Sequence, residues 1–148
     1  YVVSLIDLDT VSSGHLLTDL ADCIRSICNL AGEDASNKEH VSFDMTSCTS
    51  FLRGYFSISN KQKNNSFKFL SEFIYLITFE LTIRFLNDFL QANKYFHVRY
   101  DCHNLDRAEI QYRLLSSFLA QISNLTNELD QIGISSSLSF VSEVQKIV

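Results

Sequence analysis

The sequence has 148 residues, of which 46% are hydrophobic and 20% are charged, and its formal net charge is −5. This balance is typical of a folded domain and excludes a wholly disordered chain. The acidic charge argues against sequence-independent binding to nucleic acid or to an anionic membrane, because such binding needs a basic surplus. There is no proline and there are only four glycines, which favours long, uninterrupted elements. We therefore expect a single helical domain over 1–148.

The N-terminal part contains one clear helix. Residues 1–9 are rich in Val, Leu and Ile, and fit either a short strand or a short helix. Over 15–30 the apolar residues recur at helical spacing, and Gly32 follows where a C-terminal cap is expected. The stretch 33–41 is polar and is predicted to be a loop.

The segment 41–59 is ambiguous. It opens with the alternation of a strand and continues with apolar residues at helical spacing. Thr49 or Ser50 is the candidate N-terminal cap of that helical turn. The polar residues 60–65 that follow predict a loop.

The segment 66–92 is predicted to be a long helix at the centre of the fold. Its charged residues lie four or eight positions apart, so they share one narrow stripe on a helix: Lys68, Glu72, Glu80, Arg84 and Asp88. The rest of the helix surface is apolar and must be covered by other elements. The charges also leave no uncharged apolar run of the length that a membrane span needs.

The C-terminal half returns to helix after a short interval. Residues 94–102 alternate as a strand does, whereas 106–129 carry a continuous apolar stripe at helical spacing. Beyond Gly133, apolar residues within 138–148 fit a short last helix. The predicted fold is mainly α, a four- or five-helix bundle around 66–92, with short strands possible near 1–9 and 94–102.

The phenylalanines of the central helix are candidates for a partner-binding surface. A domain of this size has few helices with which to surround such an apolar cylinder, and uncovered rings form a patch that marks an interface. The candidate residues are Phe73, Phe79, Phe85 and Phe89. A protein partner or a second copy of the chain is expected here, whereas nucleic acid and membrane are not.

Reactive residue types gather in 97–106, where two histidines, a thiol, carboxylates and an arginine occur together. Adjacent residues of an extended segment point to opposite sides, so Cys102 and His103 are expected to diverge. No glycine flanks them, and no nucleophile motif surrounds the thiol. No catalytic residue is assigned from this cluster, and the sequence favours a protein that is not an enzyme.

The pair Arg99-x-x-x-His103, near the start of a predicted helix in a helical bundle, resembles the HEPN ribonucleases. That family uses an Arg and a His, spaced somewhat farther apart than they are here, to cleave RNA on a face of the bundle. The resemblance implies that Arg99 and His103 converge in a cleft and act together as a nuclease or as a degenerate form of one.

The cysteines leave two cellular settings open. Their number permits two disulfides, as in a secreted helical bundle of cytokine-like build, but small buried thiols in a reducing compartment are the simpler interpretation. These residues are Cys23, Cys28, Cys48 and Cys102. An intracellular location, cytoplasmic or nuclear, is therefore expected.

No metal site and no cofactor are predicted. The cysteines lack the close pairing of a zinc site, and Asp7-x-Asp9 has no third carboxylate near it in the sequence. The glycines are isolated, so no phosphate-binding loop is present. The leading interpretation is a non-enzymatic helical protein–protein interaction module, a subunit or domain of a larger assembly.

Overall fold

The protein is mainly helical, as predicted. The computed structural model describes Ser4 and residues 11–58 and 65–134. Within these ranges it contains five α-helices and no strand, and two 3₁₀ segments precede α2 and α3. In chain order the elements are α1 (Leu16–Ile27), η1 (Lys38–His40), α2 (Met45–Ile58), η3 (Asn65–Phe69), α3 (Leu70–Leu90), α4 (His103–Ala120) and α5 (Ile122–Gln131).

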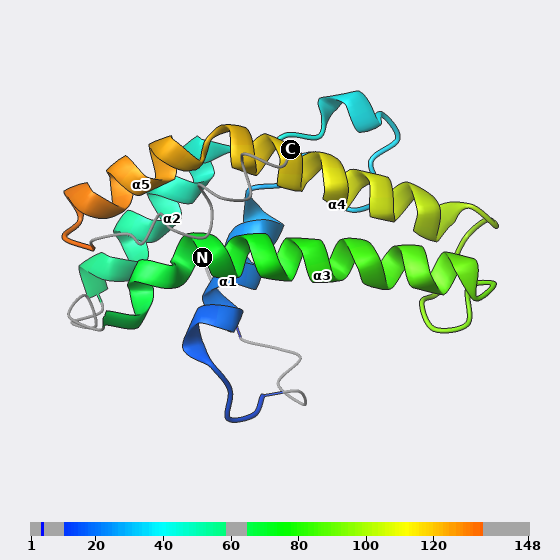
Figure 1. Ribbon diagram of the computed structural model, residues 1–148, viewed down its shortest axis with the longest axis horizontal. Helices are drawn as coiled ribbons and strands as arrows, with labels where there is room; N and C mark the ends of the chain where they lie inside the picture. The colour runs from blue at the N-terminus through cyan, green and yellow to red at the C-terminus, as the bar shows by residue number, and fades with distance from the viewer. Residues whose placement is uncertain (1–3, 5–10, 59–64, 135–148) are drawn as a thin grey trace.

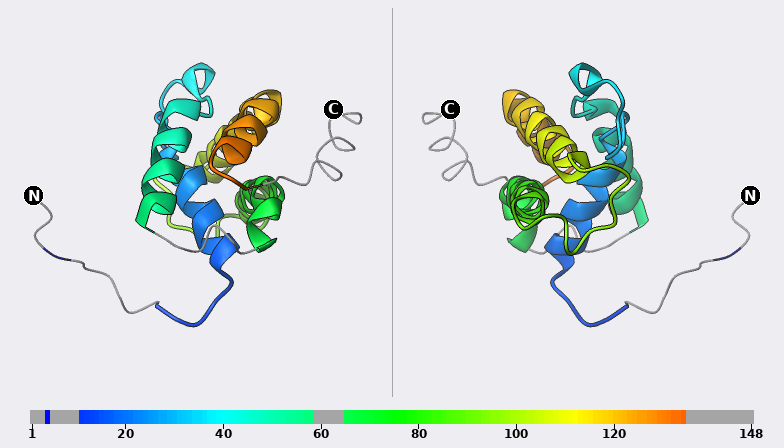
Figure 2. Two further views of the ribbon diagram at one scale, coloured as in Figure 1. Left: turned by 90° about the vertical axis from the view of Figure 1, so that its left-hand side faces the viewer. Right: turned by 90° about the vertical axis from the view of Figure 1, so that its right-hand side faces the viewer.

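The long helix α3 runs the length of the molecule, and α4 and α5 follow it end to end in the opposite direction (Figure 1). Its main packing partners are α4 and α1. Viewed along its axis, α3 lies at one corner of the bundle, with α1 on one side and α4 and α5 on another (Figure 2). The other helices of the described residues thus cover only part of the circumference of the helix predicted to be central.

One hydrophobic core joins all five α-helices. Leu17 of α1, Leu52 of α2 and Ile74 of α3 are almost fully buried in it. From the other side, Leu114 of α4 and Leu125 of α5 complete the same cluster. Burying such side chains stabilises the fold by about 2 kcal/mol each.

The ambiguous segment after residue 41 resolves into a short extended piece and a helix. Phe43 forms an isolated antiparallel bridge with Asn29, and α2 then begins at Met45. The Asp44 carboxylate accepts a 2.8 Å hydrogen bond from the backbone N–H of Ser47, which is the contact of an N-terminal cap. The helix therefore starts earlier than a cap at Thr49 or Ser50 would place it.

The strand expected near 94–102 is wrong, because these residues form a loop of turns and bends. The Asp88 carboxylate accepts hydrogen bonds from the backbone N–H groups of Tyr95 and Phe96 at 2.8 and 2.9 Å. Those donors are thereby unavailable to a β-ladder, and no strand lies beside them in the described residues. The strand or helix predicted over 1–9 and the last helix over 138–148 fall outside the described residues, Ser4 excepted.

Two helix boundaries also differ from the predictions. The long segment 66–92 starts as the 3₁₀ turn η3 before it becomes α3. The single helix predicted over 106–129 begins earlier, at His103, and breaks at Gln121. The Gln121 side chain donates to the carbonyl of Phe43 at 2.9 Å, so the junction of α4 and α5 is tied to the start of α2.

Among the described residues, no helix is both long enough and apolar enough to span a bilayer.

Candidate functional site

Helix α3 carries large apolar residues on two sides. Its buried side packs into the bundle through residues such as Leu70, Ile74 and Phe85. Two threonines on that side, Thr78 and Thr82, donate their hydroxyls to carbonyls one turn earlier in the same helix. These two hydroxyls are thus satisfied within α3 itself.

The other side of η3 and α3 exposes a line of large apolar side chains, which we call the exposed α3 stripe. Its members are Phe69, Leu76, Phe79, Ile83 and Leu90, with exposed fractions from 41% to 73%. At 3.6 residues per turn these positions fall opposite the buried side of the helix. Contiguous apolar surface of this kind marks an interaction site more often than isolated exposed residues do.

The stripe follows the spacing of a coiled coil. Phe69, Leu76, Ile83 and Leu90 are each seven residues apart, which is the interval between successive a positions of a heptad. Of the three d positions between them, Phe79 and the half-buried Leu86 are apolar and the first is Glu72. A seam with this repeat is complementary to the seam of a second helix.

A pair of opposite charges borders the stripe. Glu80 and Arg84 are one turn apart on α3 and their charged atoms are 3.7 Å apart. Both side chains are about half exposed, so the pair contributes little to stability by itself. The Arg84 guanidinium also lies over the ring of Phe96, 5.5 Å from its centre, which holds the charge at the edge of the apolar surface.

The four phenylalanines predicted to bind a partner do not share one surface. Phe79 belongs to the exposed α3 stripe, whereas Phe85 is only 3% exposed and packs inside the protein. Phe73 is half-buried and stacks on His15 with 5.2 Å between ring centres. Phe89 is also half-buried. Only Phe79 is therefore retained in the surface described here.

The structure brings Arg99 and His103 together at a third residue, Asp34. The Nε2 atom of His103 lies 2.9 Å from Oδ1 of Asp34, and a guanidinium nitrogen of Arg99 lies 3.2 Å from Oδ2. Arg107 donates through Nε to the same carboxylate at 2.8 Å. The Arg107 hydrogen bond is the largest influence on the Asp34 pKa, which is lowered although partial burial acts in the opposite direction.

The hydrogen bonds of His103 define its tautomer. The backbone N–H of Arg99 donates to Nδ1 at 3.2 Å, so Nδ1 carries no proton and Nε2–H faces Asp34. Both ring nitrogens are thereby occupied, and the ring is only 2% exposed. In this arrangement neither nitrogen is presented to a substrate.

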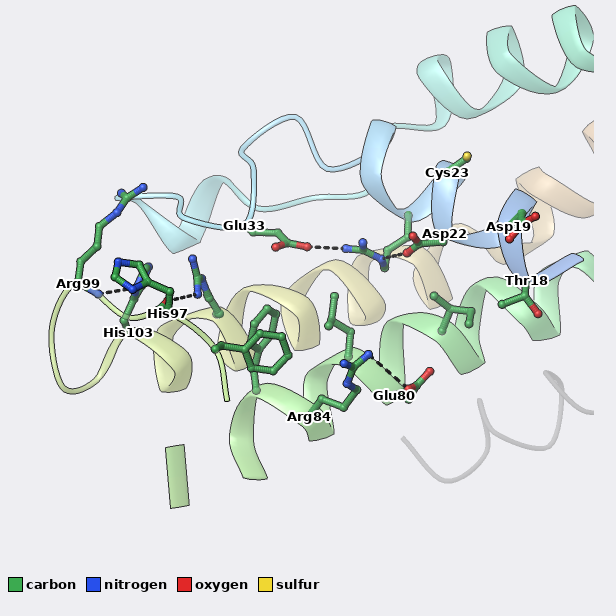
Figure 3. Close-up of a pocket in the computed structure, with 16 residues that line it drawn as sticks. Thr18, Asp19, Asp22, Cys23, Glu33, Glu80, Arg84, His97, Arg99 and His103 are labelled. Atoms are coloured by element: carbon green, nitrogen blue, oxygen red, sulfur yellow. Dashed lines mark hydrogen bonds and ion pairs between the residues drawn. The ribbon is translucent and has the colours of Figure 1, made fainter. Parts of the chain in front are cut away.

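A cavity of about 800 Å³ lies beside this cluster, between α1, α3 and α4. Arg99, His97 and His103 line one end and Asp19 and Asp22 the other, while Glu33, Glu80 and Arg84 line the part between them (Figure 3). Arg25, between them, is paired with Asp22 and Glu33 at 2.8 and 2.9 Å. These two ion pairs lie within α1 and the loop that follows it, and Arg25 reaches α4 through a 3.3 Å hydrogen bond to Gln111.

The remaining reactive residues are dispersed. Cys102 is exposed at the start of α4, whereas its neighbour His103 is buried, so the two side chains diverge as expected. Cys23 is exposed, and Cys28 and Cys48 are buried side by side in the core as free thiols. Within residues 11–58 and 65–134, no three side chains of the metal-binding types are grouped as a metal ion needs.

Sequence reasoning missed most of the exposed α3 stripe. Aromatic content alone points to the phenylalanines. The pattern that identifies the exposed surface is the seven-residue spacing that links Phe69 to Leu76, Ile83 and Leu90. Asp34 was missed because it approaches α4 only in the folded chain. No known protein-family model matches this sequence.

Proposed function

We propose that this chain is a non-enzymatic helical interaction module, a subunit or domain of a larger assembly, and that it binds through the exposed α3 stripe. The observation that carries the proposal is the row of large apolar side chains at heptad spacing on the uncovered side of the longest helix. The occupant that fits such a row is another helix with an apolar seam.

Affinity and specificity have separate sources in this proposal. Phe79 and Ile83 lie near the middle of the stripe, where a partner helix excludes water and apolar burial stabilises the complex most. Glu80 and Arg84 border the same region, where they select partners by charge complementarity. The geometry at His103 favours this function over RNA cleavage, since both of its ring nitrogens are already engaged.

The proposal includes an intracellular location, in the cytoplasm or the nucleus. Its support is the pair Cys28 and Cys48, which fill the core between α1 and α2 as thiols. A reducing compartment keeps such thiols free.

The test is a comparison of binding by the wild-type chain and by Ile83→Glu. The probe is a fluorescent synthetic peptide with Leu at the a and d positions of a heptad repeat and Glu and Lys elsewhere. Fluorescence anisotropy measures peptide binding, and sedimentation velocity measures self-association. We expect the wild type to bind in at least one of these assays and Ile83→Glu to lose that binding.

The matched control is Ile58→Glu, which makes the same change at an exposed residue at the end of α2. It is expected to bind as the wild type does, because it lies off α3. Both variants should unfold within about 0.5 kcal/mol of the wild type, since they alter exposed side chains. A wild-type chain that neither binds the peptide nor self-associates would contradict the proposal.

A further inference from the structure

We infer that the occupant of the exposed α3 stripe is the same stripe of a second copy of this chain, packed antiparallel about a two-fold axis that crosses the stripe between Phe79 and Ile83, at the level of residue 81. The inference rests on the proposed function and names its partner. Its starting point is that the stripe already has the repeat that a matching helix needs. A two-fold dimer uses the same surface on both copies, so one self-complementary seam is enough.

The apolar layers match in this register. In an antiparallel pair of helices each a position meets a d position of the other helix. With the axis at the level of residue 81, Ile83 of one copy meets Phe79 of the other, and Leu76 meets Leu86. The four central layers are then entirely apolar, whereas in the outer layers Leu90 meets Glu72 and Phe69 falls at the level of Asn93.

The charges beside the seam also match. Glu80 and Arg84 lie on the same border of the stripe, and an antiparallel two-fold axis brings this border against its own copy. Arg84 of the second copy then lies at the level of residue 78, two residues along the helix from Glu80. The long arginine side chain can span this offset. The resulting group of four charges has an Arg next to a Glu at each end, so its attractive contacts outnumber its one Glu–Glu approach.

The position of α3 leaves room for this contact. The helix has 21 residues and is therefore about 32 Å long. It lies at a corner of the bundle (Figure 2), and the side chains of its stripe are exposed rather than packed against α1 or α4. Among the described residues no helix covers the stripe, so a second helix can lie along it without displacing α1 or α4.

A charge-swap experiment tests the inference on the whole chain. Sedimentation equilibrium measures the dimer dissociation constant of the wild type, of Glu80→Arg, of Arg84→Glu and of the double variant with both changes. Each single change makes all four charges alike, so we expect the dissociation constant to rise at least about tenfold. The double variant restores an oppositely charged neighbour at each end of the group and should return to within about threefold of the wild type.

The control is Asp130→Lys, which changes the net charge in the same direction as Glu80→Arg at an exposed site on α5. It should leave the dissociation constant unchanged. A wild-type chain that stays monomeric at its highest soluble concentration overturns the inference. A double variant that dimerises as weakly as the single variants also overturns the inference. In the antiparallel register, exchanging both charges must restore dimerisation.

The failure of this inference is distinguishable from the failure of the proposed function. A monomer that binds the heptad peptide through Ile83 retains the function and excludes self-pairing. A monomer that does not bind the peptide excludes both.

Discussion

The Nε2 atom of His103 lies 2.9 Å from Oδ1 of Asp34, and this contact joins the first residue of α4 to the loop after α1. Arg107 binds the same carboxylate, so one acidic residue holds two side chains of α4. The Asp34 side chain is one-third exposed, while those of His103 and Arg107 are largely buried. The cluster that resembled a nuclease pair in the sequence therefore connects elements of the fold.

Replacing this carboxylate should destabilise the protein. Asp34→Asn removes the negative charge that faces Arg107 and His103, and we expect the free energy of unfolding to fall by about 1–3 kcal/mol. Urea denaturation at neutral pH measures the difference. Asp130→Asn, the same change at an exposed site on α5, is the control and should have little effect.

The effect of Asp34→Asn should depend on pH in a defined direction. The Arg107 hydrogen bond lowers the pKa of Asp34 in the folded state, so the ionised group stabilises the fold above the ordinary Asp pKa of about 3.9. This contribution is lost as the pH falls through the folded-state pKa. The difference between wild type and variant should therefore shrink in strong acid. A difference that grows in acid would contradict the assignment.

The carboxylate of Asp88 is more deeply buried than that of Asp34 and should matter more for stability. It is 5% exposed and accepts hydrogen bonds from two backbone N–H groups of the 94–102 loop and from Asn104 at 2.8 Å. Asp88→Ala leaves these buried donors unpaired, and we expect a loss of about 3 kcal/mol. Thermal unfolding and hydrogen exchange of the loop amides measure the effect, and Asn87→Ala at the exposed neighbouring position is the control.

The helices could be predicted from the sequence because their signals are local. Apolar residues at helical spacing identified α1, most of α3 and most of α4, since each helix buries one side in a common core. The loop at 94–102 could not be predicted in this way. Its residues alternate as a strand does, but Asp88 on the preceding helix takes the N–H groups that a strand would pair.

The candidate site was predicted only in part for a related reason. The central helix was expected to have uncovered apolar surface, but composition does not say which side of it faces the bundle. Phe79 and Phe85 are alike in sequence terms, yet their exposure differs because α1 and α4 cover one side of α3. The charged stripe could not be placed from the sequence for the same reason: its last member, Asp88, is buried rather than exposed.

The four cysteines should fall into two classes of reactivity. Cys23 and Cys102 are exposed and Cys28 and Cys48 are buried, so two thiols of the native chain should react quickly with a thiol reagent and two only on unfolding. Burial, then the charges of Asp22 and Asp19, raises the pKa of Cys23, so this thiol should react faster as the pH rises.

Single Ser substitutions of Cys23 and Cys102 assign the fast phase, since each should remove one reactive thiol. The total number of thiols in denaturant decides between the cellular settings. Four thiols support a reducing compartment, whereas none would support the secreted, disulfide-linked bundle instead.

The HEPN-like resemblance gives a prediction about RNA. Arg99→Ala removes an exposed arginine that contacts Asp34, and it should leave the fold intact. If the chain is an interaction module, the wild type and this variant should both leave single-stranded RNA uncleaved over hours at neutral pH. Cleavage by the wild type that Arg99→Ala abolishes would instead favour the nuclease.

The two phenylalanines Phe79 and Phe85 offer a matched test of the surface. Phe85→Ala opens a cavity in the interior and removes the ring on which the Arg107 guanidinium lies, 5.5 Å from its centre. We expect a loss of about 3–5 kcal/mol in the free energy of unfolding. Phe79→Ala truncates a half-exposed ring, so it should cost less than about 1 kcal/mol in the monomer.

Binding should show the reverse order. Phe79→Ala removes a central member of the exposed α3 stripe and should weaken peptide binding or self-association about tenfold or more, as loss of a buried aromatic anchor does. Phe85→Ala, assayed where it remains folded by circular dichroism, should bind nearly as the wild type does because its ring faces the core. Normal binding by Phe79→Ala would contradict the proposed surface. A partner that packs along the exposed α3 stripe must contact the Phe79 ring, which lies near its middle.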